Sequence, residues 1–574
     1  MFLKKFKIFP GILAFVIMLT LLTSCFGGNE TAVVETVNEN VVDVGNVDNV
    51  SENVGVPDVA PVSYEAADFD EFFDKIVALN QALSLMSWDI ETYGAPVDAY
   101  ESRSKAMAIL DAELFAMGIS DKMQAYFEFV ENAKERGEAD DVMLAIYRLS
   151  KEDYDKFMCI PADEYQAFSE LTLLAAQNWE RAKEESDFSI FAPYLQQVMD
   201  YNRKIVDYRA AAGMVYDNPY DAKLDDFESG MTVAQLDVFF EELRAEIVPL
   251  LQKITAAAQE RENEDFLKAL LSREVPISVQ KNISNLLMNT VNFDLNRGSL
   301  AESAHPFSTG IGTNDTRITT NYHENDAFAS FFSTLHESGH ALYMQNADEK
   351  VADTILGHGI SMGMHESQSR FLENIVGRSY EFWEAFYDDF ISASEGYYDD
   401  VSMQDLYEAA NLVEPSLIRI RADELTYSLH IMVRYEIEKL IMNDHEIKAE
   451  DLPAIWNEKM QEYLGVTPEN DAEGILQDIH WAHGEFGYFP TYALGTAYAA
   501  QMWDAMQKDF DASAAISALD IKAVTDWLKE KVHRHSSLLE QPEIFANFTD
   551  EGFSPTYYVA YLKDKYEKIY QLTA

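Results

Sequence analysis

Cysteine is almost absent from this chain of 574 residues, in which only Cys25 and Cys159 occur. Two cysteines exclude a disulfide framework and a thiolate cluster around a metal ion. Any metal site must therefore be built from histidine and carboxylate. That donor set suits a catalytic site with an open coordination position better than a structural site.

Positive charge is also scarce: the chain has 43 lysines and arginines but 99 aspartates and glutamates, which gives a formal net charge of −56. Such a surface repels phosphate backbones, so we exclude nucleic acid as a partner. The acidity identifies no partner by itself, because excess carboxylate is typical of a solvated surface. The 48% hydrophobic content, with 12% aromatic residues, is sufficient for a large core.

A long apolar run is missing at the N-terminus. Three early lysines precede an apolar stretch from Ile8 to Leu22, which is shorter than the ~20 residues that a membrane-spanning helix needs. The sequence Leu22-Thr23-Ser24-Cys25 resembles a bacterial lipobox. We therefore predict a lipoprotein signal peptide at residues 1–24 and lipidation of Cys25, which would place the protein in the bacterial cell envelope, lipid-anchored and extracytoplasmic. The alternatives are an ordinary signal peptide or an uncleaved anchor.

Basic residues are missing altogether between Lys7 and Lys75. Over residues 25–66, valine recurs among Asn, Asp, Glu and Gly, and the only aromatic residues are Phe26 and Tyr64 at the two ends, a composition that cannot form a packed core. We predict an acidic disordered tether here, which would hold the following domain some 30–40 Å from the membrane on average.

Helical periodicity dominates from residue 67 to residue 574, without an internal repeat or a second linker. The sequence predicts a mainly α fold: one large helical domain with a deep active-site cleft and a small β element. The expected helices include 101–117, 120–135, 139–156, 163–186, 190–212, 232–261, 263–272, 277–293, 414–442, 449–464, 471–478, 488–506, 519–533 and 555–571.

The expected β element is the segment 315–322, DTRITTNY, in which β-branched and polar residues alternate. The backbone of an extended substrate often pairs with a nearby strand edge of this kind. The alternative is a solvent-exposed connecting strand.

The segment 326–346 carries the sequence His336-Glu337-Ser338-Gly339-His340. Histidines at positions i and i+4 lie on one face of a helix, so both imidazoles can reach one metal ion. Glu337 is then placed to take a proton from water at the open position. Downstream, Glu366 lies on a second amphipathic stretch, 359–379, and is the candidate third ligand. Taken alone, Glu366 could equally be an acidic residue near a helix start, where the helix dipole favours it.

Seven motifs follow one another over roughly 200 residues: HPF at 305–307, DTRIT at 315–319, HESGH at 336–340, HESQSR at 365–370, IRIRAD at 418–423, GILQDIHW at 474–481 and GYFPTYALG at 487–495. Together they resemble the carboxypeptidase Taq family of metallocarboxypeptidases, and the likeness extends from about Asp68 to the C-terminus. One departure is Arg421, where family members usually have glutamate.

The resemblance implies Zn²⁺, or Co²⁺ in some members, held by His336, His340 and Glu366, with Glu337 as general base. Candidates for stabilising the oxyanion are His480, Tyr488 and Tyr492, although tyrosine on an apolar helix is more often a packing residue. His365, next to Glu366, is interpreted as supporting a ligand rather than as a ligand. The resemblance also implies a homodimer.

Removal of a C-terminal residue requires recognition of its carboxylate, for which an arginine fork is the natural partner. The candidates are Arg419, which we favour slightly, and Arg317, while His305 of the HPF motif is a further candidate for contacting the substrate. Either arginine could instead pair with an internal acid such as Asp315 or Asp423.

The sequence thus predicts a zinc carboxypeptidase that removes single residues from peptide C-termini. The first alternative is an oligopeptidase or dipeptidyl carboxypeptidase that uses the same metal site. The second is a non-catalytic surface lipoprotein that captures peptides, but a pure binder has no need of a general base at Glu337.

Overall fold

The computed structural model describes residues 64–92 and 94–572. The predicted signal peptide, the lipidation site Cys25 and the predicted tether as far as residue 63 lie outside the described residues. Among the helices that are described, none combines the length and the apolar character that crossing a membrane requires.

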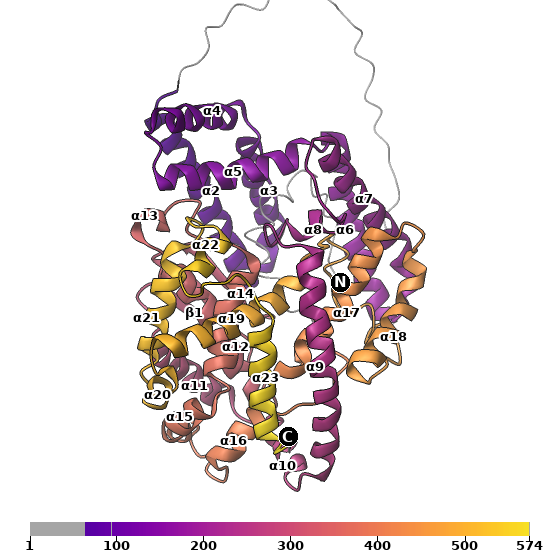
Figure 1. Cartoon of the computed structure of the whole chain (residues 1–574), viewed down its shortest axis with the longest axis vertical. Coiled ribbons are helices and arrows are strands. Elements are labelled where there is room, and N and C mark those ends of the chain that lie inside the picture. The colour runs from indigo at the N-terminus through magenta and orange to yellow at the C-terminus, as the bar shows by residue number, and fades with distance from the viewer. Residues whose placement is uncertain (1–63, 93, 573–574) are drawn as a thin grey trace, which may run out of the picture.

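The described part of the chain is mostly helical (Figure 1). Its first half contains α2 (Ala66–Glu91), α3 (Tyr100–Gly118), α4 (Asp121–Arg136), α5 (Asp141–Met158), α6 (Ala162–Glu185), α7 (Ala192–Ala211), α8 (Asp221–Leu224), α9 (Val233–Glu260), α10 (Glu264–Leu271) and α11 (Ile277–Thr290). Its second half contains α12 (Ala327–Gln345), α13 (Glu349–Ala352), α14 (Met362–Arg370), α15 (Tyr380–Ala393), α16 (Met403–Ala410), α17 (Glu424–Asn443), α18 (Leu452–Leu464), α19 (Phe489–Asp509), α20 (Ala512–Ser517), α21 (Ile521–Lys531), α22 (Gln541–Ala546) and α23 (Thr556–Ile569).

Helices α2 to α5 form a layer at one end of the molecule, drawn in indigo and violet in Figure 1. Their aromatic residues build a small core of their own, in which Phe69 and Phe73 pack against Tyr126 with ring centroids 5.3 and 4.7 Å apart. This layer meets the rest of the domain where α2 packs on the second strand of the sheet described below.

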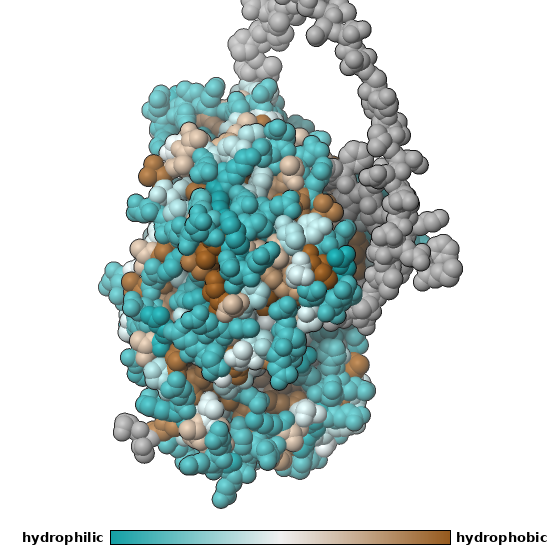
Figure 2. Space-filling model, turned by 90° about the vertical axis from the view of Figure 1, so that its right-hand side faces the viewer, coloured by the Kyte–Doolittle hydropathy of each residue, from teal (hydrophilic) through white to brown (hydrophobic). Residues whose placement is uncertain are grey.

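The larger core extends from α6 to α23 and surrounds α12 and α14. The long helix α9 runs beside α23 (Figure 1). The last helix of the chain thus packs on a helix from the middle of the sequence. The face of the molecule in Figure 2 is predominantly hydrophilic, with apolar residues scattered among polar ones, which agrees with the solvated acidic surface expected from the sequence.

Three short strands, β1 (Gly298–Glu302), β2 (Ser308–Gly312) and β3 (Asp315–Thr320), form the sheet. β3 lies in the centre, parallel to β1 and antiparallel to β2, and α12 packs against it. The strand predicted at 315–322 therefore exists, but both of its edges are already paired. A substrate therefore cannot pair with β3 itself, and pairing with a nearby edge, the outer edge of β1 or β2, stays a prediction. The alternative of an exposed connecting strand is wrong, because Ile318, Thr319 and Thr320 are fully buried.

Most helices begin and end within two or three residues of their predicted bounds. Two predictions were wrong. The helix expected from Glu414 begins only at Glu424, because the Asp423 carboxylate accepts hydrogen bonds from the amides of Leu425 and Thr426, each at 3.0 Å, and so caps a helix start there. The segment 471–478 forms a series of turns instead of a helix.

Candidate active site

Helix α12 carries the two candidate histidine ligands and is buried on nearly every side, with only two of its 19 residues outside the buried set. Its own turns satisfy its polar side chains: the hydroxyls of Thr334 and Ser338 each donate to a carbonyl four residues earlier, at 2.7 Å. A helix buried all round is held in place by its neighbours, which fixes where its side chains point. His336 and His340 thus share one face, with ring centroids 4.9 Å apart.

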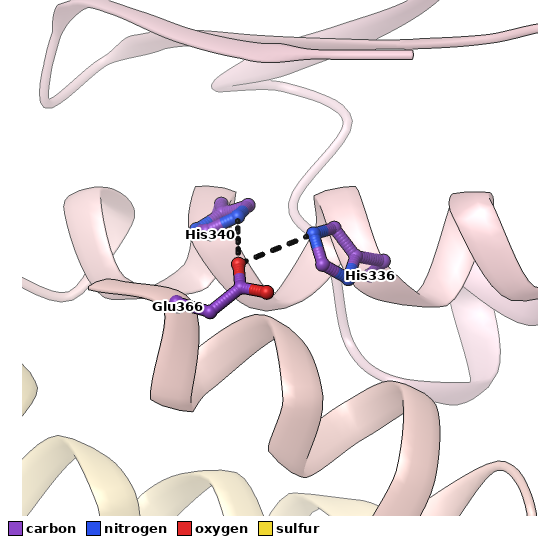
Figure 3. A group of neighbouring side chains, drawn as sticks. All are labelled: His336, His340 and Glu366. Carbon is purple, nitrogen blue, oxygen red and sulfur yellow. Dashed lines mark ion pairs between the residues drawn. The ribbon is translucent and has the colours of Figure 1, made fainter. Parts of the chain in front are cut away.

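Helix α14 brings Glu366 to the same point from the opposite side (Figure 3). The Glu366 Oε2 atom lies 3.5 Å from His336 Nε2 and 3.4 Å from His340 Nε2. Two glycines allow this approach. A Cβ on Gly339 would lie 2.3 Å from the Gln368 carbonyl of α14, and a Cβ on Gly495 of α19 would lie 2.6 Å from the Glu366 side chain.

Each histidine has a partner on its other ring nitrogen. His336 Nδ1 lies 2.9 Å from Oε2 of Glu373, and His340 Nδ1 lies 2.6 Å from Nδ1 of His365. Such contacts leave the Nε2 atoms facing the site, and they fix the ring orientation that a metal ligand needs. Glu373 comes from Phe371–Val376, a π-helical stretch that continues α14.

Arg370 neutralises the carboxylates around this point. Its Nε donates to Glu366 Oε1 at 2.7 Å, and its Nη1 donates to Glu373 Oε2 at 3.1 Å. Burial alone would raise the pKa of Glu366, but Arg370 and His336 outweigh burial and hold this pKa well below its usual range. Glu366 is therefore ionised, as a metal ligand must be.

The three side chains fit a metal ion. Their ligand atoms lie within 4.8 Å of one another, and all three residues are buried. His336 Nε2 is a buried polar atom without a hydrogen-bond partner among the described residues, which is costly unless a ligand occupies the space before it. Two imidazoles and one carboxylate leave a fourth tetrahedral position open, as catalytic sites do.

Glu337 is 2% exposed and follows the first histidine directly. Burial raises the pKa of Glu337 to about 7, and the neighbouring Glu366 adds to the rise, while His336 opposes it. A carboxyl group whose pKa is close to neutrality can both accept and return a proton, which is the property of a general base in hydrolysis.

The three oxyanion candidates lie together at the start of α19. His480 Nε2 is 3.4 Å from the Tyr492 hydroxyl, and the Tyr488 ring is 5.3 Å from the His480 ring and 5.2 Å from the Tyr492 ring. Burial lowers the pKa of His480 to about 3, so its imidazole is neutral and can donate one proton. Helix α19 packs along α14, the helix that carries Glu366.

The candidates for recognising a substrate carboxylate differ in exposure. Arg419 is 1% exposed, and its Nε and Nη2 atoms donate to Asp478 Oδ1 at 3.1 and 2.9 Å. The Arg317 side chain is 25% exposed, and it binds both carboxylate oxygens of Asp315 at 2.7 Å. His305 is half-buried in the loop between β1 and β2. Each arginine is thus paired with an acid of the chain.

Sequence reasoning missed three residues around the site: Glu373, Arg370 and Asp478. For Glu373 a signal was present, because it lies seven positions after Glu366 and so on the same helix face. Arg370 offered the same kind of signal, because it lies four positions after Glu366 and so also on that helix face. Nothing in the sequence pointed to Asp478 as the partner of Arg419.

The chain is similar to known proteins over nearly its whole described length. Residues 68–566 match the family model "Carboxypeptidase Taq (M32) metallopeptidase". "Carboxypeptidase 1" of Bacillus subtilis (strain 168) is 41% identical over 508 residues, which cover 88% of this chain and 98% of that protein. "Thermostable carboxypeptidase 1" of Pyrococcus furiosus is 35% identical, over 86% of this chain and 97% of that protein.

Among solved structures, the M32 carboxypeptidase from Deinococcus radiodurans R1 superposes with a TM-score of 0.82 at 30% identity, over 88% of this chain and 99% of that chain. Such coverage extends from the first described helices to the last, so the likeness concerns the whole domain and not the metal-binding helix alone. The chain therefore belongs to the carboxypeptidase Taq (M32) family of metallopeptidases and is a metallocarboxypeptidase.

Proposed function

We propose that His336, His340 and Glu366 hold Zn²⁺, and that Co²⁺ can replace it. The support is the donor set, since imidazole and carboxylate suit both ions and leave a coordination position open. When bound, the metal polarises the scissile carbonyl and lowers the pKa of water. The buried Nε2 of His336, which has no hydrogen-bond partner among the described residues, is the single observation that carries the assignment.

Glu337 is the general base in this proposal. It accepts the proton of the attacking water and then donates a proton to the leaving amine. The raised pKa of Glu337, about 7, supports both roles, because the carboxyl group can exist in either form near neutral pH.

His480, Tyr488 and Tyr492 are proposed to supply the donor that the developing oxyanion needs besides the metal. Their mutual proximity supports one shared role. The neutral state of His480 makes it a hydrogen-bond donor rather than a fixed positive charge.

For the terminal carboxylate of the peptide we propose an arginine, and its exposure favours Arg317 over Arg419, the candidate that the sequence favoured. A substrate can reach a guanidinium that is one-quarter exposed and displace Asp315, whereas Arg419 is enclosed with Asp478. His305 is retained as a contact to the substrate. The deep cleft over these residues remains a prediction.

Cleavage of single residues is tested by comparing a peptide with a free C-terminus and the same peptide with a C-terminal amide. A carboxypeptidase should cut the amide much more slowly, because the charge-assisted contact to the carboxylate is lost. Equal rates would favour the oligopeptidase, and a product two residues shorter would favour the dipeptidyl carboxypeptidase. The non-catalytic peptide binder would leave both peptides intact.

We propose further that Cys25 is lipidated and that the enzyme acts on the outside of a bacterial membrane, and this proposal rests on the sequence of residues 1–25 alone. If Cys25→Ser protein fractionates with membranes as the parent does, and the parent carries no acyl group, the anchor is disproved. The proposed homodimer rests on the family resemblance alone, and light scattering of the purified protein tests it.

A further inference from the structure

Glu228 is a buried carboxylate whose role the chemistry above does not use. It is 2% exposed and lies in the segment 225–231, between α8 and α9. Its Oε1 accepts hydrogen bonds from the Tyr498 hydroxyl at 3.1 Å, the Gln541 amide at 2.7 Å and the Ser361 hydroxyl at 3.0 Å, and its Oε2 accepts one from Gly363 N at 2.9 Å.

Two of these four donors belong to the start of α14. The first amides of a helix have no partner within the helix and must find one elsewhere. In α14, Met362 N donates to the carbonyl of Phe227 at 3.3 Å, Gly363 N donates to Glu228, and Met364 N donates to the Ser361 hydroxyl at 3.1 Å. All three amides are thus satisfied, two of them by residues 227 and 228.

The fit between Glu228 and α14 is close. A Cβ on Gly363 would lie 2.6 Å from Glu228 Oε2, so only glycine lets the carboxylate reach the helix backbone here. A negative charge at a helix N-terminus is also favoured by the helix dipole. The other two donors, Tyr498 of α19 and Gln541 of α22, hold the carboxylate through Oε1, the oxygen that also accepts from Ser361.

Glu366 follows Gly363 by three positions, so a shift of the helix start moves the Glu366 carboxylate relative to the histidines of α12. The same contacts tie α14 to α19, whose Gly495 lies against the Glu366 side chain. Phe227 links the segment 225–231 to the oxyanion candidates as well, because its ring lies 5.2 Å from the ring of Tyr488.

We propose that Glu228 is a positioning residue of the metal centre: it holds the start of α14 so that Glu366 meets His336 and His340 at the distance a metal ion requires. The inference rests on the metal assignment proposed above. It predicts that loss of the charge weakens metal binding although Glu228 touches no ligand.

The test compares the dissociation constants for Zn²⁺ of the parent, Glu228→Gln and Asp221→Asn, measured by competition with a chelator. Asp221 is a matched control: it is 5% exposed and lies close to Glu228 in the sequence, and its carboxylate accepts from Val233 N at 2.7 Å at the start of α9, which carries no ligand. Burial raises the pKa of Glu228 to about 7, so the titrations are run at pH 8, where the parent is ionised.

We expect the dissociation constant of Glu228→Gln to rise about tenfold, as for partners that orient metal ligands. For Asp221→Asn we expect it to stay within twofold of the parent. The melting temperature of the metal-free proteins should fall by similar amounts in both variants. If Glu228→Gln binds Zn²⁺ as tightly as the parent, or if Asp221→Asn weakens binding equally, the proposal is overturned. A parent that binds no Zn²⁺ overturns the metal assignment as well.

Should Glu228→Gln fail to fold, Ser361→Ala answers the same question, because it removes one donor to Glu228 and one acceptor at the start of α14. It should weaken Zn²⁺ binding about threefold. Binding unchanged in Ser361→Ala would contradict the proposal.

Discussion

The guanidinium of Arg419 donates two hydrogen bonds to one carboxylate oxygen of Asp478, at 3.1 and 2.9 Å. The other oxygen of Asp478 accepts from Arg434, so this carboxylate lies between two arginines. The Arg419 guanidinium also lies 4.9 Å above the Tyr492 ring. Arg419 thus connects Asp478, which lies two positions before His480, to Tyr492 in the first turn of α19. His480 and Tyr492 are both candidates for oxyanion stabilisation.

Replacing Arg419 with methionine should therefore lower kcat for every peptide. Removal of one partner from a buried ion pair disturbs the residues that it held, and displacement of a catalytic group by about 1 Å can cost about a hundredfold in rate. We expect kcat to fall about ten- to a hundredfold, equally for free and amidated C-termini, in steady-state assays on both peptides. A loss confined to free C-termini would instead make Arg419 the residue that binds the substrate carboxylate.

Replacing Arg317 with methionine should have the opposite signature. Loss of a charge-assisted contact to the substrate carboxylate should cost about 2–4 kcal/mol, or roughly thirty- to a thousandfold in kcat/KM for a free C-terminus. An amidated peptide should be affected much less, so the preference of the enzyme for free C-termini should largely disappear. If that preference survives in Arg317→Met, another residue recognises the carboxylate.

Metal removal should destabilise the parent protein but not a variant without the histidine ligands. A ligand present at a thousandfold excess over its dissociation constant stabilises the native state by about 4 kcal/mol. Addition of Zn²⁺ to chelator-treated parent should therefore raise its melting temperature, while His336→Ala/His340→Ala should show no shift in the same scan. Stoichiometric metal in the double variant would refute the assignment.

Asp111 should make the stability of the N-terminal helical layer depend on pH. It is 9% exposed, its Oδ1 has no hydrogen-bond partner among the described residues, and burial raises its pKa from 3.8 to about 7. The folded state therefore binds the proton more tightly than the unfolded state. This contribution makes the free energy of unfolding fall as the pH rises from about 4 to about 7.

The variant Asp111→Asn should remove this dependence. With the residual exposure of Asp111 taken into account, we expect it to be more stable than the parent at pH 8 by about 1–2 kcal/mol and nearly unchanged at pH 4. Urea denaturation at the two pH values measures the difference. If Asp111→Asn is destabilised by the same amount at pH 4 and at pH 8, the raised pKa of Asp111 is contradicted.

Sequence patterns predicted the parts of the fold that depend on neighbours a few positions apart. Helix α12 was expected at 326–346 and spans Ala327–Gln345, because helical periodicity and the i, i+4 histidines are local signals. Strands β1 and β2 were missed: the segments GSLAE and STGIG are only five residues long, each contains glycine, and neither shows the alternation of β-branched and polar residues that marks a strand.

Contacts between distant segments could not be predicted from local patterns. Glu228 and Gly363 lie 135 positions apart, and Arg419 and Asp478 lie 59 positions apart. For an arginine in so acidic a chain, the number of carboxylates that could pair with it is large. The fold determines the pairing: Arg419 pairs with Asp478 and not with Asp423, the partner considered from the sequence.

The central claim, that this chain removes single residues from free C-termini by metal-dependent hydrolysis with Glu337 as base, is tested most directly by mass spectrometry of an unbiased peptide library. The library is incubated with the parent, with chelator-treated parent and with Glu337→Gln. The account predicts products one residue shorter at the C-terminus from the parent only, their loss on chelation, and a fall of at least about a thousandfold in Glu337→Gln, which keeps its metal. Internal cleavage products, or undiminished activity in either control, would contradict it.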